Sequence, residues 1–289
     1  MTFILQWLSA LRRWLYATGI LRAYRAARPV VSIGNLGFGG SGKTPVVMAL
    51  AQALTARGLR VVILSRGYGG THTGSTIVQP NADAAVVGDE PLLLARKSGA
   101  PVVVDRNRAR AAAWAMRELQ PDLFLLDDGF SHLKLARDLD WIMLSPADLH
   151  TFAPRRELRR QLRHASLVTA IDAPRLIRLG LIKHGLERRV TDAGLAGQRV
   201  VAIAAIAHPE RFTDTLLSVG ATVVASRFYR DHAVLPASAF VDLPPHDFIV
   251  ITEKDAVKLA RLPPHCVVLE THVVIPAALL DRVAALVRK

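Results

Sequence analysis

Residues 34–54, "GNLGFGGSGKTPVVMALAQAL", decide the fold: five glycines fall within nine residues, and a Lys-Thr pair precedes an apolar run with helical spacing. Residues 37–44 fit the pattern G-x-x-x-x-G-K-[ST] in full. In such a loop the backbone N–H groups and the N-terminus of the following helix face phosphate oxygens. The expected phosphate-binding residues are Gly37, Gly39, Gly40, Ser41, Gly42, Lys43 and Thr44.

The flanking residues favour a nucleotide site over a glycine-rich turn without a ligand. Residues 29–33 read as a buried strand and residues 45–54 as a helix, with Pro45 in the first turn, where its missing N–H costs nothing. In this context Lys43 is expected to reach the β- and γ-phosphates, and the Thr44 hydroxyl to bind Mg²⁺. The predicted cofactors are therefore ATP and Mg²⁺.

Three further apolar runs, residues 60–64, 101–105 and 122–126, alternate with helical patterns. A phosphate-binding loop after the first strand and this alternation predict an α/β fold of the P-loop NTPase type, with a doubly wound, mostly parallel sheet. The fourth strand ends in Asp127 and Asp128. Carboxylates delivered beside a phosphate loop are the usual acidic partners of Mg²⁺, so both are candidate metal ligands.

Two other polar side chains follow strands at the same predicted edge. Arg66 lies in the turn after the second strand and Asn107 follows the third. Ligands of open α/β sheets bind at the carboxyl ends of the strands. Both residues are therefore candidate substrate contacts, and a plain surface turn explains Arg66 nearly as well.

The composition limits the class of protein. The chain has 289 residues, 51% of them hydrophobic, and a single cysteine, which excludes a disulfide framework and favours a reducing compartment. The net charge of +13 favours an anionic partner: nucleic acid, an anionic membrane or a phosphorylated substrate. No nucleic-acid recognition module or aromatic stacking platform is evident, so a nucleic-acid partner is not expected.

Residues 1–28 carry five arginines and no acid, and Phe3, Trp7, Leu11 and Trp14 recur on one helical face. Arg12 and Arg13 interrupt the apolar stretch, so the segment is too short to span a bilayer. A basic amphipathic helix of this kind is typical of an interfacial membrane anchor. A helix packed on the domain shows the same pattern and stays open as the alternative.

Eight stretches of the chain occur together in an order typical of one protein family: "VVSIGNLGFGGSGKTP", "LSRGYGG", "VGDEPLLLARK", "VDRNRARA", "LLDDGFSHLKLARDLD", "AIAHPERFTDTLLSVGA", "RDHAVLP" and "TEKDAVKL". Through them the chain resembles the tetraacyldisaccharide 4′-kinases, the lipid A 4′-kinases of Gram-negative bacteria. The resemblance implies transfer of the ATP γ-phosphate to the 4′-hydroxyl of a tetraacylated glucosamine disaccharide 1-phosphate. It also implies a peripheral enzyme at the cytoplasmic face of the inner membrane, with no obligate protein partner.

The resemblance further implies a base made of an aspartate and a histidine. The aspartate of "GDEP" is Asp89, and the histidine of "RDHAVLP" is His232. A carboxylate that orients an imidazole makes a better base for a sugar hydroxyl than either group alone. Within "TEKDAVKL", Thr252 and Asp255 fit a helix capping box, and Lys254 is a candidate nucleotide-side contact.

Two departures from the family pattern concern the site. Ser131 stands where the family usually has glutamine after "DDGF". The family loop "LPAGPLRE" is shortened to "FAPRRE", residues 152–157, in which Arg156 and Glu157 align as candidate substrate contacts.

The expected organisation has three parts: an amphipathic helix over 1–28, a P-loop kinase domain over 29–195, and a smaller α/β domain over 196–289 that closes over the site. The alternative function is a membrane-associated P-loop NTPase switch that phosphorylates no lipid. Such a switch predicts a guanine-reading motif or runs of metal-binding His or Cys, and the sequence contains neither.

Overall fold

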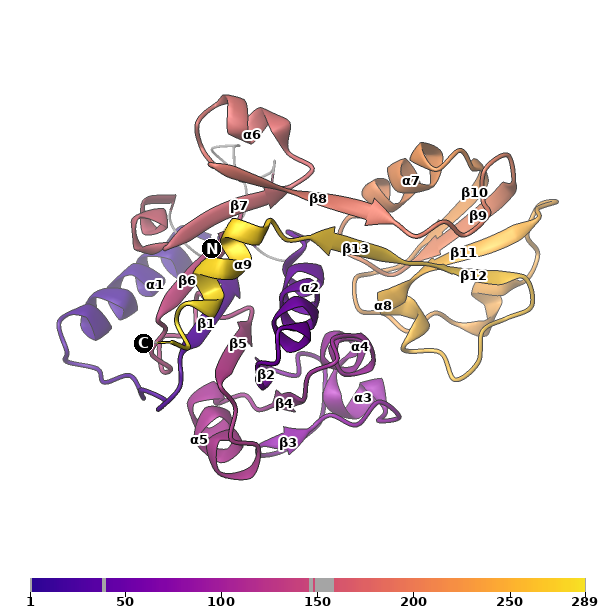
Figure 1. Cartoon of the computed structure of the whole chain (residues 1–289). Helices are drawn as coiled ribbons and strands as arrows, with labels where there is room; N and C mark the ends of the chain where they lie inside the picture. The colour runs from indigo at the N-terminus through magenta and orange to yellow at the C-terminus, as the bar shows by residue number, and fades with distance from the viewer. Residues whose placement is uncertain (1, 38–39, 146–147, 149–158, 289) are drawn as a thin grey trace.

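The computed structural model describes residues 2–37, 40–145, 148 and 159–288. Two sheets are present (Figure 1). In spatial order, the larger sheet contains β13 (Thr271–Val274), β8 (His184–Val190), β7 (Leu167–Ile171), β6 (Leu139–Met143), β1 (Val30–Gly34), β5 (Leu123–Asp127), β2 (Val61–Ser65), β4 (Val102–Val104) and β3 (Thr76–Ile77). The smaller sheet contains β10 (Thr222–Phe228), β9 (Arg199–Ala204), β11 (Phe248–Thr252) and β12 (Cys266–Leu269).

Helices flank both sheets. The α-helices are α1 (Thr2–Ala17), α2 (Lys43–Ala56), α3 (Ala84–Val87), α4 (Asp89–Lys97), α5 (Arg108–Glu118), α6 (Pro174–Arg178), α7 (Pro209–Ser218), α8 (Glu253–Ala256) and α9 (Ala277–Ala284). Within the described residues, Arg159–His164 and Ala237–Phe240 form 3₁₀ helices. No helix within the described part of the chain is long and apolar enough to cross a membrane.

The larger sheet is mostly parallel, as predicted; β3 and β13, at its two edges, are antiparallel to their neighbours. Successive side chains of β1 point to opposite faces: Val31 belongs to the core under α2, α4 and α9, whereas Val30 belongs to the core under α5. Apolar side chains are thus buried on both faces, and the predicted strands read as continuous hydrophobic runs for that reason. The fold class predicted from the sequence is confirmed.

The C-terminal boundary expected for the smaller domain is wrong. After β12 the chain returns to the larger sheet, where β13 pairs with β8 and Thr271 lies opposite Val190. Leu279 and Val283 of α9 are then buried in the core that α2 covers. Residues 271–288 therefore belong to the larger unit, because their apolar side chains are buried there.

Candidate active site

The phosphate loop connects β1 to α2, as the sequence predicts. Gly40 has a φ of 62°, and a Cβ built on it would lie 2.0 Å from Cδ2 of His208, so both the backbone and the close approach require glycine. Gly42 caps the N-terminus of α2, which points the first N–H groups of the helix at the loop. This arrangement can hold a phosphate through backbone donors.

Lys43 lies between this loop and the end of β5. Its side chain is only 11% exposed, and Nζ lies 3.5 Å from Oδ1 of Asp128. Asp128 follows the last residue of β5, and β5 pairs directly with β1. Sheet pairing therefore brings the predicted acidic pair beside the phosphate loop.

Asp127 is almost completely buried at the end of β5. Its Oδ2 accepts a hydrogen bond from Ser65 Oγ at 3.3 Å. Its Oδ1 is buried with no hydrogen-bond partner among the described residues. Burial, together with the charges of Glu90 and Asp128, raises the pKa of Asp127 to about 7. A buried carboxylate with a spare oxygen is an unstable arrangement unless a cation accompanies it.

The donor set fits Mg²⁺. Thr44, Asp127 and Asp128 offer only oxygen atoms, and a protein holds Mg²⁺ mainly through one or two carboxylates, with phosphates and water completing the shell. In keeping with this, the residues that the structure describes contain no group of three His, Cys, Asp or Glu side chains that could hold a metal by themselves.

The structure brings Asp89 and His232 together across 143 residues of sequence. Asp89 opens α4 in the larger unit, and His232 follows β10 in the smaller one. Nδ1 of His232 lies 3.0 Å from both carboxylate oxygens of Asp89. The backbone of His232 has a φ of 66°, a left-handed conformation that histidine adopts more often than most residues with a Cβ.

The contact between Asp89 and His232 shifts the pKa of each group in an opposite direction. Burial by itself would raise the pKa of Asp89, but the hydrogen bond to His232 and the charges of Lys254 and Lys258 outweigh it and lower that pKa. The same hydrogen bond raises the pKa of His232, against burial and the charge of Lys254. Asp89 is thus held ionised, and it holds the Nδ1–H tautomer of His232.

Lys254 occupies the other side of the His232 ring. Its Nζ lies 3.2 Å from Nε2 of His232, 3.2 Å from Glu90 and 3.1 Å from Asp231. Burial lowers the pKa of Lys254, but the carboxylates of Glu90, Asp89 and Asp231 raise it more, so the ammonium stays charged. Thr252 caps α8 by accepting from Asp255 N at 3.2 Å, which confirms the N-cap half of the predicted capping box; the Asp255 carboxylate accepts from the Thr252 hydroxyl at 2.7 Å.

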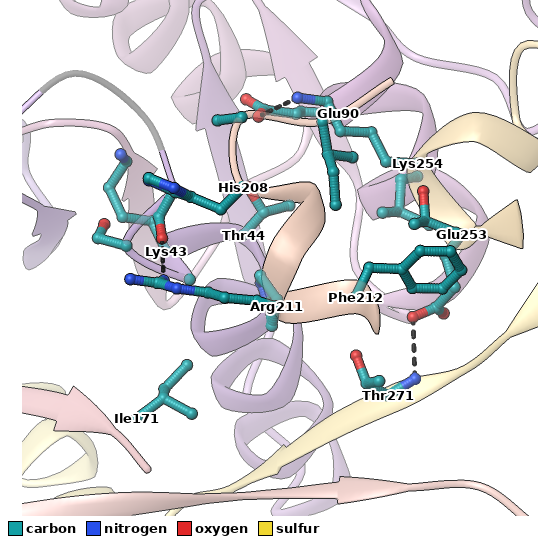
Figure 2. A pocket seen from close by; sticks show the side chains of 18 of the residues that line it. Lys43, Thr44, Glu90, Ile171, His208, Arg211, Phe212, Glu253, Lys254 and Thr271 are labelled. Atoms are coloured by element: carbon teal, nitrogen blue, oxygen red, sulfur yellow. Dashed lines mark hydrogen bonds and ion pairs between the residues drawn. The ribbon is translucent and has the colours of Figure 1, made fainter. Parts of the chain in front are cut away.

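A cavity of about 280 Å³ joins these groups between the two units. Lys43 and Thr44 line one side, and Lys254 lines another (Figure 2). From the smaller unit, His208 lies over the phosphate loop, and Arg211 Nη1 donates to Gly40 O at 2.8 Å (Figure 2). The cavity has the polar and apolar walls that a nucleotide needs, with the loop at one end and His232 beside it.

Several predicted site residues lie elsewhere. Arg66 is exposed at the end of β2, and its charge lowers the pKa of Arg108. Asn107 caps α5 by accepting from Arg110 N at 3.4 Å, so its side chain already has a structural partner. Three predicted residues, Gly39, Arg156 and Glu157, lie outside the described residues.

Arg108 is a site-facing residue that the sequence reasoning missed. It is buried, and burial lowers its pKa to about 10, although Asp128, Asp127 and Asp105 oppose this. It is therefore a cation beside the acidic pair. The sequence could have indicated this role, because Arg108 follows β4 at the carboxyl-end edge of the sheet, where polar residues also follow the other parallel strands.

A parallel sheet with this loop, and an acid–histidine pair aimed at the same cavity, define a P-loop kinase. Comparison with known proteins agrees. The model of the family "Tetraacyldisaccharide-1-P 4′-kinase" matches residues 1–288. The tetraacyldisaccharide 4′-kinase of Chromobacterium violaceum is 40% identical over 282 residues, which cover 88% of this chain and 81% of that protein. The enzyme of the same name from Azoarcus sp. is 39% identical over 279 residues, covering 89% and 81%.

A solved structure is similar over nearly the whole chain. It is LpxK from Aquifex aeolicus, crystallised in complex with ATP, with a TM-score of 0.79 and 26% sequence identity over 99% of this chain and 96% of that one. The chain belongs to the tetraacyldisaccharide-1-P 4′-kinase family. It is therefore an ATP-dependent kinase of lipid A biosynthesis, and not the nucleotide-hydrolysing switch considered as the alternative.

Proposed function

We propose that His232, held by Asp89, takes the proton from the 4′-hydroxyl of a tetraacylated glucosamine disaccharide 1-phosphate. The observation that carries this proposal is the double contact of Nδ1 with Asp89 at 3.0 Å. An Nδ1–H directed at a carboxylate leaves the Nε2 lone pair to accept a proton. Because Lys254 Nζ lies 3.2 Å from Nε2, the acceptor hydroxyl has to displace this ammonium.

The phosphate loop would bind the phosphates of ATP. Lys43 and the backbone N–H groups of residues 40–44 would hold the β- and γ-phosphates of ATP, the nucleotide that the related Aquifex aeolicus protein binds. Thr44, Asp127 and Asp128 would hold Mg²⁺, which neutralises phosphate charge when bound. The chain itself contributes positioning and a charged cavity, and these supply most of the catalysis in phosphoryl transfer.

We further propose that α1 rests on the cytoplasmic face of the inner membrane. Trp7, Leu11 and Trp14 are 64%, 52% and 55% exposed, whereas Gln6 and Arg13 of the same helix are buried. The helix thus turns a polar face to the protein and an apolar face outward, the reverse of an ordinary packed helix. An outward apolar stripe with aromatic rings suits the headgroup region, where an acylated substrate also lies.

One assay tests the reaction. Purified protein is incubated with γ-labelled ATP, Mg²⁺ and the tetraacyl disaccharide 1-phosphate in detergent, and label is expected in the lipid. His232→Ala should lower turnover strongly and leave ATP affinity nearly intact, whereas Lys43→Ala should weaken ATP binding. Loss of ATP binding in His232→Ala would instead make His232 a nucleotide ligand.

A second assay tests the membrane contact. Replacing Trp7, Leu11 and Trp14 together by glutamine should release the protein from sedimenting anionic vesicles, because the outward apolar area is lost. Vesicles of neutral lipid serve as the control for the electrostatic part. Unchanged sedimentation of the triple variant would refute the interfacial helix.

A further inference from the structure

The inward face of α1 contacts the segment that follows the acidic pair. Arg13 is buried, and its Nη2 donates to the backbone carbonyl of Phe130 at 3.0 Å. Its guanidinium carbon lies 4.3 Å from the centre of the Phe130 ring, a cation–π arrangement. The neighbouring Arg12 donates to the carbonyl of Ser131. Two consecutive arginines thus bind two consecutive carbonyls, three and four residues after Asp127.

The same segment is held from the other side by the strand that leads into the phosphate loop. Gly129 N donates to Ile33 O at 3.2 Å. Phe130 is buried, and a Cβ built on Gly34 would lie 2.4 Å from the Phe130 Cβ, so the two backbones approach as closely as glycine permits. Phe130 is therefore clamped between the end of β1 and Arg13.

Asp128 lies next to this clamp. Its φ is 50°, a left-handed conformation that aspartate adopts more readily than most residues but that still costs free energy in any residue with a Cβ, so the surroundings help to maintain it. Lys43 is one of these surroundings, since its Nζ lies 3.5 Å from Oδ1 of Asp128. Two further restraints follow Asp128 directly: Gly129 N donates to Ile33 O, and Phe130 is held by Arg13 through a hydrogen bond and ring contact.

We propose that Arg13, assisted by Arg12, is a positioning residue that holds Asp127 and Asp128 in the geometry that binds Mg²⁺. The inference rests on the metal role given to the two aspartates above. It adds a role inside the protein to the interfacial role predicted for the basic helix, because both arginines donate hydrogen bonds to backbone carbonyls. The contacts are to backbone carbonyls, so they do not depend on the serine at position 131.

A metal-binding measurement distinguishes a role of Arg13 in positioning the two aspartates from a role in stabilising the fold alone. Arg13→Met keeps an unbranched apolar side chain, shorter than that of arginine, and removes the donors and the charge; Arg22→Met, at an exposed position, is the matched control in the same N-terminal region. Mn²⁺ affinity is measured by electron paramagnetic resonance in the presence of a non-hydrolysable ATP analogue. We expect Arg13→Met to weaken it roughly tenfold, the usual effect of losing an outer-shell partner, and Arg22→Met to leave it unchanged.

Arg12→Met supplies a second, milder variant at an exposed position, for which a smaller loss of Mn²⁺ affinity is expected. Hydrogen exchange at the amides of residues 128–132 should become faster in both arginine variants and stay unchanged in Arg22→Met. Raising Mg²⁺ should restore turnover of Arg13→Met toward the wild-type value.

Wild-type Mn²⁺ affinity in folded Arg13→Met and Arg12→Met, with only a lowered melting temperature, would overturn the inference. The metal assignment itself is tested by Asp128→Asn. If that variant binds Mn²⁺ as tightly as the wild type, the proposed role of the acidic pair fails first, and the inference fails with it.

Discussion

At the scale of single residues, the two nitrogens of His232 have opposite environments. Nδ1 faces the carboxylate of Asp89, which is backed by Lys258 at 3.9 Å. Nε2 faces Lys254 at 3.2 Å and Asp231 at 3.6 Å. The pKa of His232 is raised because the hydrogen bond to Asp89 outweighs burial and the charge of Lys254. The pH dependence of the reaction should follow from this balance.

Asp89→Asn should move the acid limb of the pH–rate profile to lower pH. The base acts in its neutral form, so activity is lost as pH falls through the pKa of His232. Without the carboxylate that pKa drops, and the limb moves down with it. Turnover at the optimum should fall by about 100-fold, since the imidazole is no longer oriented. The measurement is kcat/KM for label transfer against pH; an unmoved limb would contradict the pairing.

Lys254→Met should move the same limb in the opposite direction. Removing the ammonium removes a charge that lowers the pKa of His232 and leaves Asp231 and Glu90 unneutralised, so the imidazolium persists to higher pH. Lys183→Met, at an exposed lysine, is the control for the loss of one positive charge. Identical limbs in Lys254→Met and Lys183→Met would exclude Lys254 as a neighbour of the base in solution.

At the scale of elements, local sequence patterns predicted the helices and caps whose contacts lie within the same segment. The helix after the phosphate loop and the cap at Thr252 depend on neighbours within a few residues. The strand before the loop was recognisable from its apolar run, although it pairs with the distant β5 and β6. The sequence reasoning missed β3, β6, β7, β8 and β13. Strand β8, "HGLERRV", carries charges on a partly exposed strand and lacks a continuous apolar run. Its pairing with β7 and β13 comes from distant segments, which no local pattern reports.

Thr252→Ala should destabilise the smaller unit by about 1 kcal/mol, the usual value of a lost N-cap. The variant loses the bond from Asp255 N at 3.2 Å and the donation of the hydroxyl to Asp255 Oδ2 at 2.7 Å. Thr252→Ser keeps the hydroxyl and should retain most of the stability. The free energy of unfolding in urea measures the difference, and equal stabilities of the alanine and serine variants would contradict the capping role.

At the scale of the whole molecule, one lysine joins the connections between the two units. Lys97 ends α4, and its Nζ lies 2.7 Å from Glu253 of α8 and 2.6 Å from Glu270, between β12 and β13. The other connection follows β8, and Thr191 N donates to Glu270 O at 3.0 Å. The two crossings therefore lie side by side: β8 runs toward the smaller sheet, and β13, antiparallel to it, runs back from there (Figure 1).

Lys97→Met should loosen the smaller unit relative to the phosphate loop. Lys97 is 31% exposed, so screening limits the stability loss to about 1 kcal/mol or less, and high salt should reduce the difference from wild type. The larger effect should be a few-fold rise in KM for ATP, since the cavity has walls from both units. Arg57→Met, which breaks a pair with Asp281 inside the larger unit, is the control. An equal rise in KM for both variants would contradict a specific role of the crossing.

The sequence by itself determined how the phosphate donor is bound. The glycines, Lys43 and Thr44 form a phosphate loop when a strand precedes them and a helix follows, because the contacts within the loop are local. The fold class followed from the same alternation of elements. Only the tertiary structure decided that Asp89 meets His232, that residues 271–288 return to the larger sheet, and that Arg13 binds the segment after the acidic pair. Each of these contacts joins residues more than 80 positions apart, and chain folding, not spacing, sets such distances.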